Sequence, residues 1–175
     1  MSDGSALESF WYIGANPTVD IVLLRDDPVT RRRQVLLIQR SRDAGAEAGK
    51  WALPGGFHST TAVRGEPWTP GVESAREACL RELHEETGLD VADLEPALRE
   101  VGVYEGGGRD PRDTATAWSR STAFALLLPA AAAARHVAGS DDASDAKWFA
   151  LEALPPLAFD HEQILADGLA RLSAA

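Results

Sequence analysis

The sequence predicts a single α/β domain, and three observations carry this prediction. The chain has 175 residues and a mass of 18.7 kDa, which is the size of one domain. Short runs rich in Val, Ile and Leu alternate with polar or glycine-containing turns, and two longer segments carry apolar residues at helical spacing. With 45% hydrophobic and 25% charged residues the composition is globular, so a wholly disordered chain or a coiled coil is excluded.

The expected strands are short and apolar. Residues 18–24 and 34–38 predict two strands joined by a turn at Asp26-Asp27-Pro28. Further strands are expected at 98–104 and 121–128, with a last short one at 147–149. Between the first and second pairs, the apolar residues 51–53 end abruptly at Pro54-Gly55-Gly56, and 57–71 predict an irregular loop.

Residues 72–87 give the clearest helical pattern. One apolar stripe contains Val72, Ala75, Cys79 and Leu83. Gly88 follows as an expected C-cap, and Glu73 is expected in the first turn, where the helix dipole favours an acid. Residues 159–172 predict a second helix that closes the domain.

The charge balance limits the class of partner. Against 27 acidic residues stand 17 basic ones, so the formal net charge is −10, and binding to a nucleic-acid backbone is not expected. An anionic ligand would need local arginines or a metal. The lone Cys79 cannot form an internal disulfide, and neither a signal peptide nor a membrane-spanning run is recognised. A cytoplasmic protein without a membrane partner is therefore expected.

Three carboxylates are concentrated within five residues of the first helix. Glu82 shares a helix face with Glu85 and Glu86, where three anions repel one another unless a cation neutralises them. Hard oxygen ligands at this density suit Mg²⁺ or Mn²⁺. Arg81 is placed to pair with Glu77 or Glu85, four residues away on either side. The alternative is a solvated, charged helix face without a ligand.

The glutamates belong to a longer pattern that resembles the signature of the Nudix hydrolase family, G-x5-E-x7-R-E-U-x-E-E-x-G-U, where U is bulky and apolar. From Glu73 to Leu89 every fixed position is present at the required spacing. The resemblance implies an α/β/α sandwich with a mixed sheet and a catalytic loop-helix-loop. Residues 1–17 are then expected as an N-terminal extension and 18–175 as one Nudix domain. The chain departs from the signature at one point, because sixteen residues rather than five separate Gly56 from Glu73, so 57–72 contain an inserted loop.

The same resemblance implies a metal site. Glu82 and Glu86 are the expected ligands of Mg²⁺ or Mn²⁺, Glu85 is a third ligand or positions the attacking water, and the Gly56 carbonyl completes the site. Such enzymes hydrolyse a nucleoside diphosphate linked to another moiety, a reaction in which bound metal activates water and neutralises charge.

Catalytic roles follow from the signature positions. Arg81 is expected to orient the carboxylates, and Glu73 to act structurally or through a water. Glu85 is the first choice for the general base, because the base must lie near the attacking water. The alternatives left open for the base are Glu105, Asp110, Asp142 and Glu162.

A looser resemblance indicates the ADP-ribose pyrophosphatase branch of the family. The segments Arg109-Asp110-Pro111-Arg112-Asp113-Thr114 and Phe159-Asp160-His161 are similar to features of that branch. Arg109 and Arg112 are therefore expected to bind substrate phosphate or ribose, since guanidinium groups fit phosphate oxygens, although a surface hairpin is the alternative. His161 is expected either to cap and pack the last helix or to contact substrate.

The expected reaction is hydrolysis of ADP-ribose to AMP and ribose 5-phosphate. Two alternatives stay open at this point: a house-cleaning nucleoside triphosphate pyrophosphatase, and a sensor that binds ADP-ribose without cleaving it. The expected partner is a small nucleoside diphosphate-type substrate, with neither nucleic acid nor membrane. Dimers are frequent in this branch, and residues 7–13 are apolar enough to contribute to a homodimer.

Overall fold

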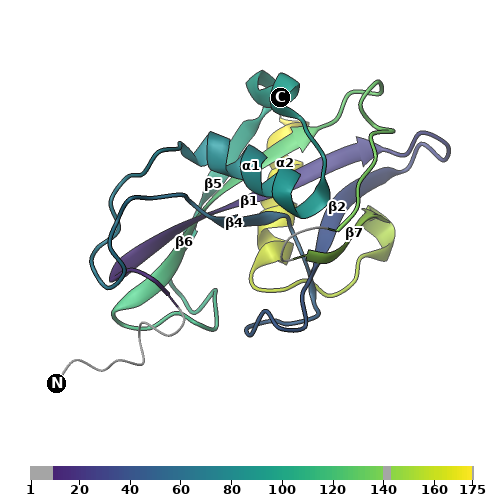
Figure 1. Cartoon of the computed structure of the whole chain (residues 1–175). Helices are drawn as coiled ribbons and strands as arrows, with labels where there is room; N and C mark the ends of the chain where they lie inside the picture. Colours follow the sequence, from purple (N-terminus) through teal and green to yellow (C-terminus); the bar gives the residue numbers. More distant parts are fainter. Residues whose placement is uncertain (1–9, 140–142, 175) are drawn as a thin grey trace.

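A computed structural model describes residues 10–139 and 143–174. The elements in chain order are β1 Gly14–Asp26, β2 Arg33–Arg40, β3 Trp51–Ala52, β4 Gly55–Phe57, α1 Ala75–Thr87, the 3-10 helix η2 Ala92–Ala97, β5 Arg99–Glu105, β6 Ala117–Leu127, β7 Ala143–Ala150, the 3-10 helix η3 Leu151–Ala153, and α2 His161–Ser173. Every predicted strand and helix is present, with shifted ends (Figure 1).

The sheet is mixed, and its central strand β1 pairs with one strand along one edge and with two strands along the other. β1 runs parallel to β6 from Gly14 to Leu24. Along its other edge, β1 is antiparallel to β4 at Thr18–Asp20 and antiparallel to β2 only at Leu24–Asp26. β2 then continues alongside β7 and β3. The short strand β4 therefore lies beside the middle of β1, which places Gly55 and Gly56 within the sheet, opposite Asp20 and Val19.

The two helices cover opposite faces of this sheet (Figure 1). Side chains alternate along β1, so that Ile21 and Leu23 join the core beneath α1, while Val22 and Leu24 join the core beneath α2. This arrangement confirms the predicted α/β/α sandwich with a mixed sheet. Asp20 is two residues from Val22 on β1, so its side chain lies on the same face of the sheet, the face covered by α2.

Helix α1 begins three residues later than the apolar stripe predicted. Ser74 is the N-cap and forms a reciprocal capping box with Glu77, which satisfies the first free N–H groups. Val72 therefore lies outside the helix and is 78% exposed, and Glu73 precedes the cap instead of occupying the first turn. The end was predicted correctly, because Gly88 takes a left-handed φ of 69° as the C-cap.

The inserted loop after Phe57 contains neither helix nor regular strand, as predicted. It is nevertheless tied to the segment that precedes β1: the Gly65 N–H donates to the Trp11 carbonyl at 2.8 Å, and the Ile13 N–H donates to the Glu66 carbonyl at 3.1 Å. The insertion thus packs on the N-terminal segment.

The expected N-terminal extension is described only in part. Residues 1–9 lie outside the described residues, and β1 begins at Gly14, four residues before the predicted strand. Trp11 and Ile13 are exposed, whereas Phe10 is fully buried. The domain bounds and the homodimer remain predictions. No helix in residues 10–139 and 143–174 is long and apolar enough to cross a membrane.

Candidate active site

A pocket of about 350 Å³ lies beside β4 and extends from α1 to the start of α2. Its walls contain five carboxylates, those of Asp20, Glu82, Glu85, Glu86 and Asp110. They also contain the guanidinium groups of Arg40, Arg109 and Arg112. The structure therefore brings together the signature glutamates, Gly56 and both predicted substrate-binding arginines in one cavity. Glu73 and Arg81 lie immediately behind the glutamates.

Arg81 connects the signature residues to one another. Its Nε and Nη2 donate to the two oxygens of Glu73 at 2.9 and 2.6 Å, and its Nη1 donates to Glu82 at 2.7 Å and to Glu85 at 2.9 Å. Nη2 also donates to the carbonyl of Phe57 at 2.9 Å. The side-chain bond from Arg81 lowers the pKa of Glu73 to about 2. One guanidinium thus fixes three glutamates and the end of β4.

Glu86 is buried in the wall of the pocket, and the side chain of Glu82 beside it is 14% exposed. Burial raises the pKa of Glu82, and it raises the pKa of Glu86 well above its ordinary value. Glu86 is only 7% exposed and accepts the Gly55 N–H at 2.9 Å. Gly56 approaches Glu82 so closely that a Cβ on Gly56 would lie 2.5 Å from its carboxylate. A residue with a side chain could not stand there unless Glu82 moved.

These residues fit a divalent cation in their donor chemistry. The buried Glu86 and the largely shielded Glu82, beside a backbone carbonyl, offer hard oxygen ligands, and their desolvation is costly until a positive charge joins them. Among the residues that the structure describes, no three His, Cys, Asp or Glu side chains converge closely enough to hold a metal as they stand. Arg81 holds Glu82, and the Gly55 N–H holds Glu86.

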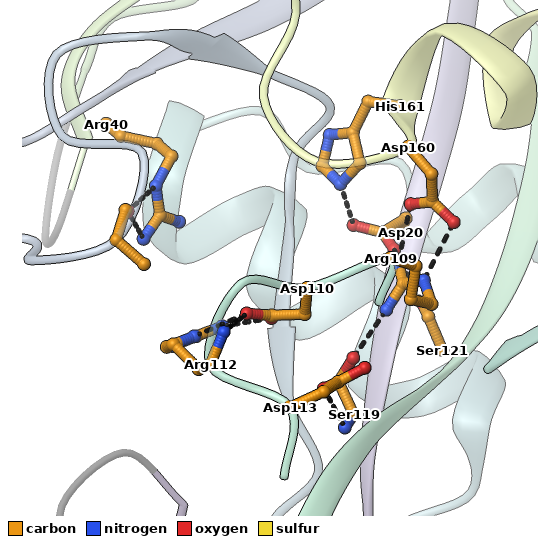
Figure 2. Close-up of polar contacts among 11 residues, drawn as sticks. Asp20, Arg40, Arg109, Asp110, Arg112, Asp113, Ser119, Ser121, Asp160 and His161 are labelled. Carbon is orange, nitrogen blue, oxygen red and sulfur yellow. Dashed lines mark hydrogen bonds and ion pairs between the residues drawn. The ribbon is translucent and has the colours of Figure 1, made fainter. Parts of the chain in front are cut away.

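Arg109 is bound almost completely within the protein. Its Nε and Nη2 form a bidentate pair with Asp160 at 2.8 and 2.7 Å, and its Nη1 donates to the Ser119 hydroxyl at 2.7 Å (Figure 2). Its Nη2 also lies 4.0 Å from Asp20. Arg109 therefore joins the start of α2 to β1 and β6, and few of its donors still face the pocket.

Arg112 is paired in a similar way, but its surroundings are aromatic. Its Nε and Nη2 donate to both oxygens of Asp110 at 2.9 and 2.7 Å. The guanidinium lies 5.3 Å from the ring centre of Phe10, 6.0 Å from that of Phe57 and 5.7 Å from that of Phe159. The segment that carries Arg109 and Arg112, for which a surface hairpin was the alternative, therefore forms a wall of the pocket.

Arg40 is a pocket residue that the sequence did not indicate. It ends β2, at a point where the register with β7 shifts. Its Nε and Nη2 donate to the carbonyl of Ala46 at 3.2 and 3.1 Å, and its guanidinium lies 4.9 Å from the ring centre of Phe159. Within residues 10–139 and 143–174 no carboxylate comes within 4.0 Å of it. Burial and the charge of Arg112 lower the pKa of Arg40.

The alternative general bases are mostly distant from the pocket. Glu105 pairs with Arg120 on the surface. Glu162 lines a separate apolar hollow along α2, and Asp142 lies outside the described residues. Asp110 is in the pocket but is only 4% exposed and holds Arg112. Glu85 lines the pocket with a side chain that is 41% exposed, so it lies beside Glu82 and Glu86 and is also open to solvent.

His161 and Asp20 complete the pocket from the α2 side. His161 is buried, its Nδ1 accepts the Leu53 N–H at 2.9 Å, and its Nε2 lies 3.3 Å from Asp20 Oδ1 (Figure 2). Asp20 also accepts the Ser121 hydroxyl. The sequence left His161 undecided and did not indicate Asp20, because strand position alone does not reveal a buried polar partner 141 positions away in sequence.

Comparison with known proteins agrees with this geometry. The NUDIX domain family model matches residues 14–168, so the chain belongs to this family, and it is a Nudix hydrolase. It is 34% identical over 142 residues to an ADP-ribose pyrophosphatase of Methanocaldococcus jannaschii, a match that covers 81% of this chain and 69% of that one. The family carries out hydrolysis with divalent metal ions.

Solved structures of related proteins share the fold. The NUDIX domain of Shewanella oneidensis NrtR, in a cocrystal with ADP ribose, is 28% identical with a TM-score of 0.71, covering 98% of this chain and 99% of that one. A longer NrtR chain complexed with a 27mer DNA is 29% identical with a TM-score of 0.63, covering 90% and 62%. A MutT/nudix family protein of Enterococcus faecalis is 25% identical with a TM-score of 0.70, covering 91% of this chain and 62% of that one. This chain thus spans under two thirds of the latter two proteins.

Proposed function

We propose that this pocket hydrolyses ADP-ribose to AMP and ribose 5-phosphate with the help of a divalent cation, Mg²⁺ or Mn²⁺. The observation that carries the proposal is the pair of carboxylates Glu82 and Glu86, the second of them buried, beside Gly56 in a pocket that also contains three guanidinium groups. Negative charge on one side and positive charge on the other suit a metal-bound diphosphate. The names of the Methanocaldococcus relative and the Shewanella cocrystal support ADP-ribose as the substrate.

The residues of the metal site divide into ligands and supports. Glu82, Glu86 and the Gly56 carbonyl would hold the cation, with Glu85 as a third carboxylate at the pocket wall. A bound divalent cation supplies a water of lowered pKa and neutralises charge on phosphoryl oxygens. Arg81 and Glu73 keep the carboxylates in place, since neither lines the pocket and each holds the other through two hydrogen bonds.

Proton removal from the attacking water is assigned to Glu85. Its carboxylate lines the pocket, is partly open to solvent, and is held by Arg81 through a single bond at 2.9 Å. A base must reach the attacking water and keep a free oxygen lone pair, and the exposed place of Glu85 in the pocket wall and its single hydrogen bond support this assignment. Asp110 meets neither as fully, because both of its oxygens hold Arg112.

Substrate contacts are assigned to the three pocket arginines. Arg40 is the pocket arginine whose charge no carboxylate among the described residues pairs, because its Nε and Nη2 donate only to a backbone carbonyl. Arg109 and Arg112 each hold a carboxylate with a bidentate fork, so they contribute positive potential and at most their remaining donors. The diphosphate would then lie between these groups and the glutamates.

A substrate screen tests the proposal directly. ADP-ribose, NADH, diadenosine polyphosphates, nucleotide sugars and deoxynucleoside triphosphates are each incubated with Mg²⁺ or Mn²⁺, and the products are separated by ion-exchange chromatography. ADP-ribose is expected among the best substrates, with AMP and ribose 5-phosphate in equal amounts. A clear preference for triphosphates, with release of pyrophosphate, would instead establish the house-cleaning activity.

The likeness to the Shewanella NUDIX domain favours a second candidate, a sensor that binds ADP-ribose without cleaving it. The full set of signature residues argues for catalysis, because Glu82, Glu85, Glu86 and Arg81 are all present and mutually connected or adjacent. Titration calorimetry with ADP-ribose separates the two. Binding without turnover in the presence of Mg²⁺ and Mn²⁺ would favour the sensor.

A further inference from the structure

His161 is a buried side chain whose function the proposed reaction does not use. It is the first residue of α2, and it reaches from that helix across to the connection between β3 and β4. It is 4% exposed, yet it lines the pocket. A histidine in such a place is usually considered first as an acid or a base.

The hydrogen bonds of His161 argue against proton transfer. Nδ1 accepts the Leu53 N–H at 2.9 Å, which requires that this nitrogen carry no proton. Nε2 then carries the proton and faces Asp20 Oδ1 at 3.3 Å. Both ring nitrogens are therefore engaged with the protein, and neither is free to take a proton from a water.

Leu53 begins the short connection to β4, the strand that carries the Gly56 carbonyl. This connection is held along its length: the Pro54 carbonyl accepts the Ile21 N–H at 2.9 Å, and the Gly55 N–H donates to Glu86 at 2.9 Å. At its start, the Leu53 N–H is held by His161 alone among the described residues. The position of Gly56 relative to Glu82 therefore depends partly on a contact made from the α2 side of the sheet.

The orientation of the imidazole is itself fixed. Asp20 lies 3.3 Å from His161 Nε2, accepts the Ser121 hydroxyl, and lies 4.0 Å from Arg109. Arg109 in turn donates to Asp160, the residue that precedes His161 (Figure 2). A turn of the ring away from Leu53 would also separate Nε2 from Asp20.

We propose that His161 is a positioning residue, which fixes the Leu53–Gly56 connection through the Leu53 N–H and thereby sets the Gly56 carbonyl for the metal. The inference rests on the proposed function, since it assumes a metal at Gly56. Groups that support metal ligands in this way commonly change metal affinity by about 10- to 100-fold when they are removed.

Two isosteric substitutions separate the two contacts of His161. In His161→Asn the amide oxygen can stand at the Nδ1 position and still accept the Leu53 N–H, whereas the contact to Asp20 is lost. In His161→Gln the amide nitrogen can reach the Nε2 position and donate to Asp20, whereas the acceptor for Leu53 is lost. Leu169→Ala serves as a control, because it loosens the packing of α2 two turns further along without touching this connection.

The first readout is Mn²⁺ binding to the metal-free protein, measured by the electron paramagnetic resonance of free Mn²⁺. His161→Gln is expected to raise the dissociation constant about 10-fold or more, whereas His161→Asn and Leu169→Ala stay close to wild type even where their melting temperatures fall. In steady-state hydrolysis, the Mg²⁺ concentration for half activation should rise in parallel, with a smaller change in kcat at saturating metal. Equal Mn²⁺ affinities in His161→Gln and His161→Asn would overturn the inference.

A measurement on the wild-type chain avoids any loss of folding in the variants. If the Leu53–His161 bond favours metal binding, then metal binding must strengthen that bond to the same extent. Hydrogen exchange at the Leu53 amide is therefore expected to slow on addition of Mg²⁺, and unchanged exchange at saturating Mg²⁺ counts against the inference. A wild-type chain that bound neither Mn²⁺ nor Mg²⁺ would overturn the proposed function itself, and the positioning role with it.

Discussion

Arg81 holds both carboxylate oxygens of Glu73, with Nε at 2.9 Å and Nη2 at 2.6 Å. The pair joins the middle of α1 to the residue just before its N-cap. It therefore holds the segment that enters the helix against the helix face that carries the glutamates. The Ser59 N–H donates to the same carboxylate at 2.6 Å. The inserted loop is thereby anchored at its first turn, which explains how the domain accommodates a longer connection than the signature has.

This pair predicts a stability that depends on acid pH. Because the folded-state pKa of Glu73 is about 2 and its ordinary value is 4.5, the ionised carboxylate stabilises the fold above pH 4.5, and this stabilisation is lost as the pH falls toward 2. The contribution should be on the order of 2 kcal/mol after solvent screening is allowed for. Urea unfolding between pH 2 and 6 on wild type and Glu73→Gln measures it. Curves that stay parallel across this range would contradict the prediction.

Glu86→Gln is expected to separate catalysis from folding. The glutamine oxygen can still accept the Gly55 N–H, while the metal loses a charged ligand, so Mg²⁺-dependent hydrolysis should fall by about 100-fold or more. Because the substitution also removes a buried, raised-pKa carboxylate, the metal-free variant should melt no lower than wild type. Hydrolysis rates and thermal melts in EDTA check both halves. Wild-type turnover would defeat the assignment of Glu86 to the metal.

The elements of this fold were predictable because their signals are local. Apolar runs predicted the strands, and Gly88 predicted the end of α1 correctly. The start of α1 was predicted wrongly because the apolar spacing of Val72 was given more weight than the Ser74–Glu77 capping box, which the sequence also contains. β4 begins with two glycines, which disfavour a strand, and its pairing with β1 is what makes it one.

The candidate site likewise contains residues with a local sequence signal and residues that only the fold brings together. Its glutamates lie within one helical segment, so spacing alone placed them on one face. Asp20, Arg40 and His161 come from separate elements, and they reach the pocket only through the order of strands in the sheet. The sequence could not show which pocket arginine is left without a carboxylate partner, because the partners of Arg109 and Arg112 become known only from the structure.

Gly56→Ala is expected to impair the metal site while leaving the fold in place. The added Cβ would meet the Glu82 carboxylate at 2.5 Å, and the flexible end of Glu82 must move away. Mn²⁺ affinity and hydrolysis should both fall, by about 10-fold or more if ligand geometry is disturbed as strongly as in other metal sites. Gly102→Ala is the matched control, because its Cβ would meet only the Tyr104 ring at 3.8 Å, an ordinary contact. An unchanged Mn²⁺ affinity in Gly56→Ala would show that the metal does not need this approach.

Arg40→Gln tests which arginine meets the substrate. The guanidinium faces the pocket with no carboxylate within 4.0 Å among the described residues, so a substrate phosphate would be its charged partner. Losing one charge-assisted hydrogen bond costs about 1.5–3 kcal/mol, so KM for ADP-ribose should rise about 10- to 100-fold. A lysine at this position keeps the charge without the planar fork, and it should recover only part of the loss. Arg42→Gln removes the same charge from an exposed position two residues away and should leave KM unchanged. Steady-state kinetics at saturating Mg²⁺ decide the matter: equal KM values in Arg40→Gln and Arg42→Gln would show that Arg40 does not contact the substrate.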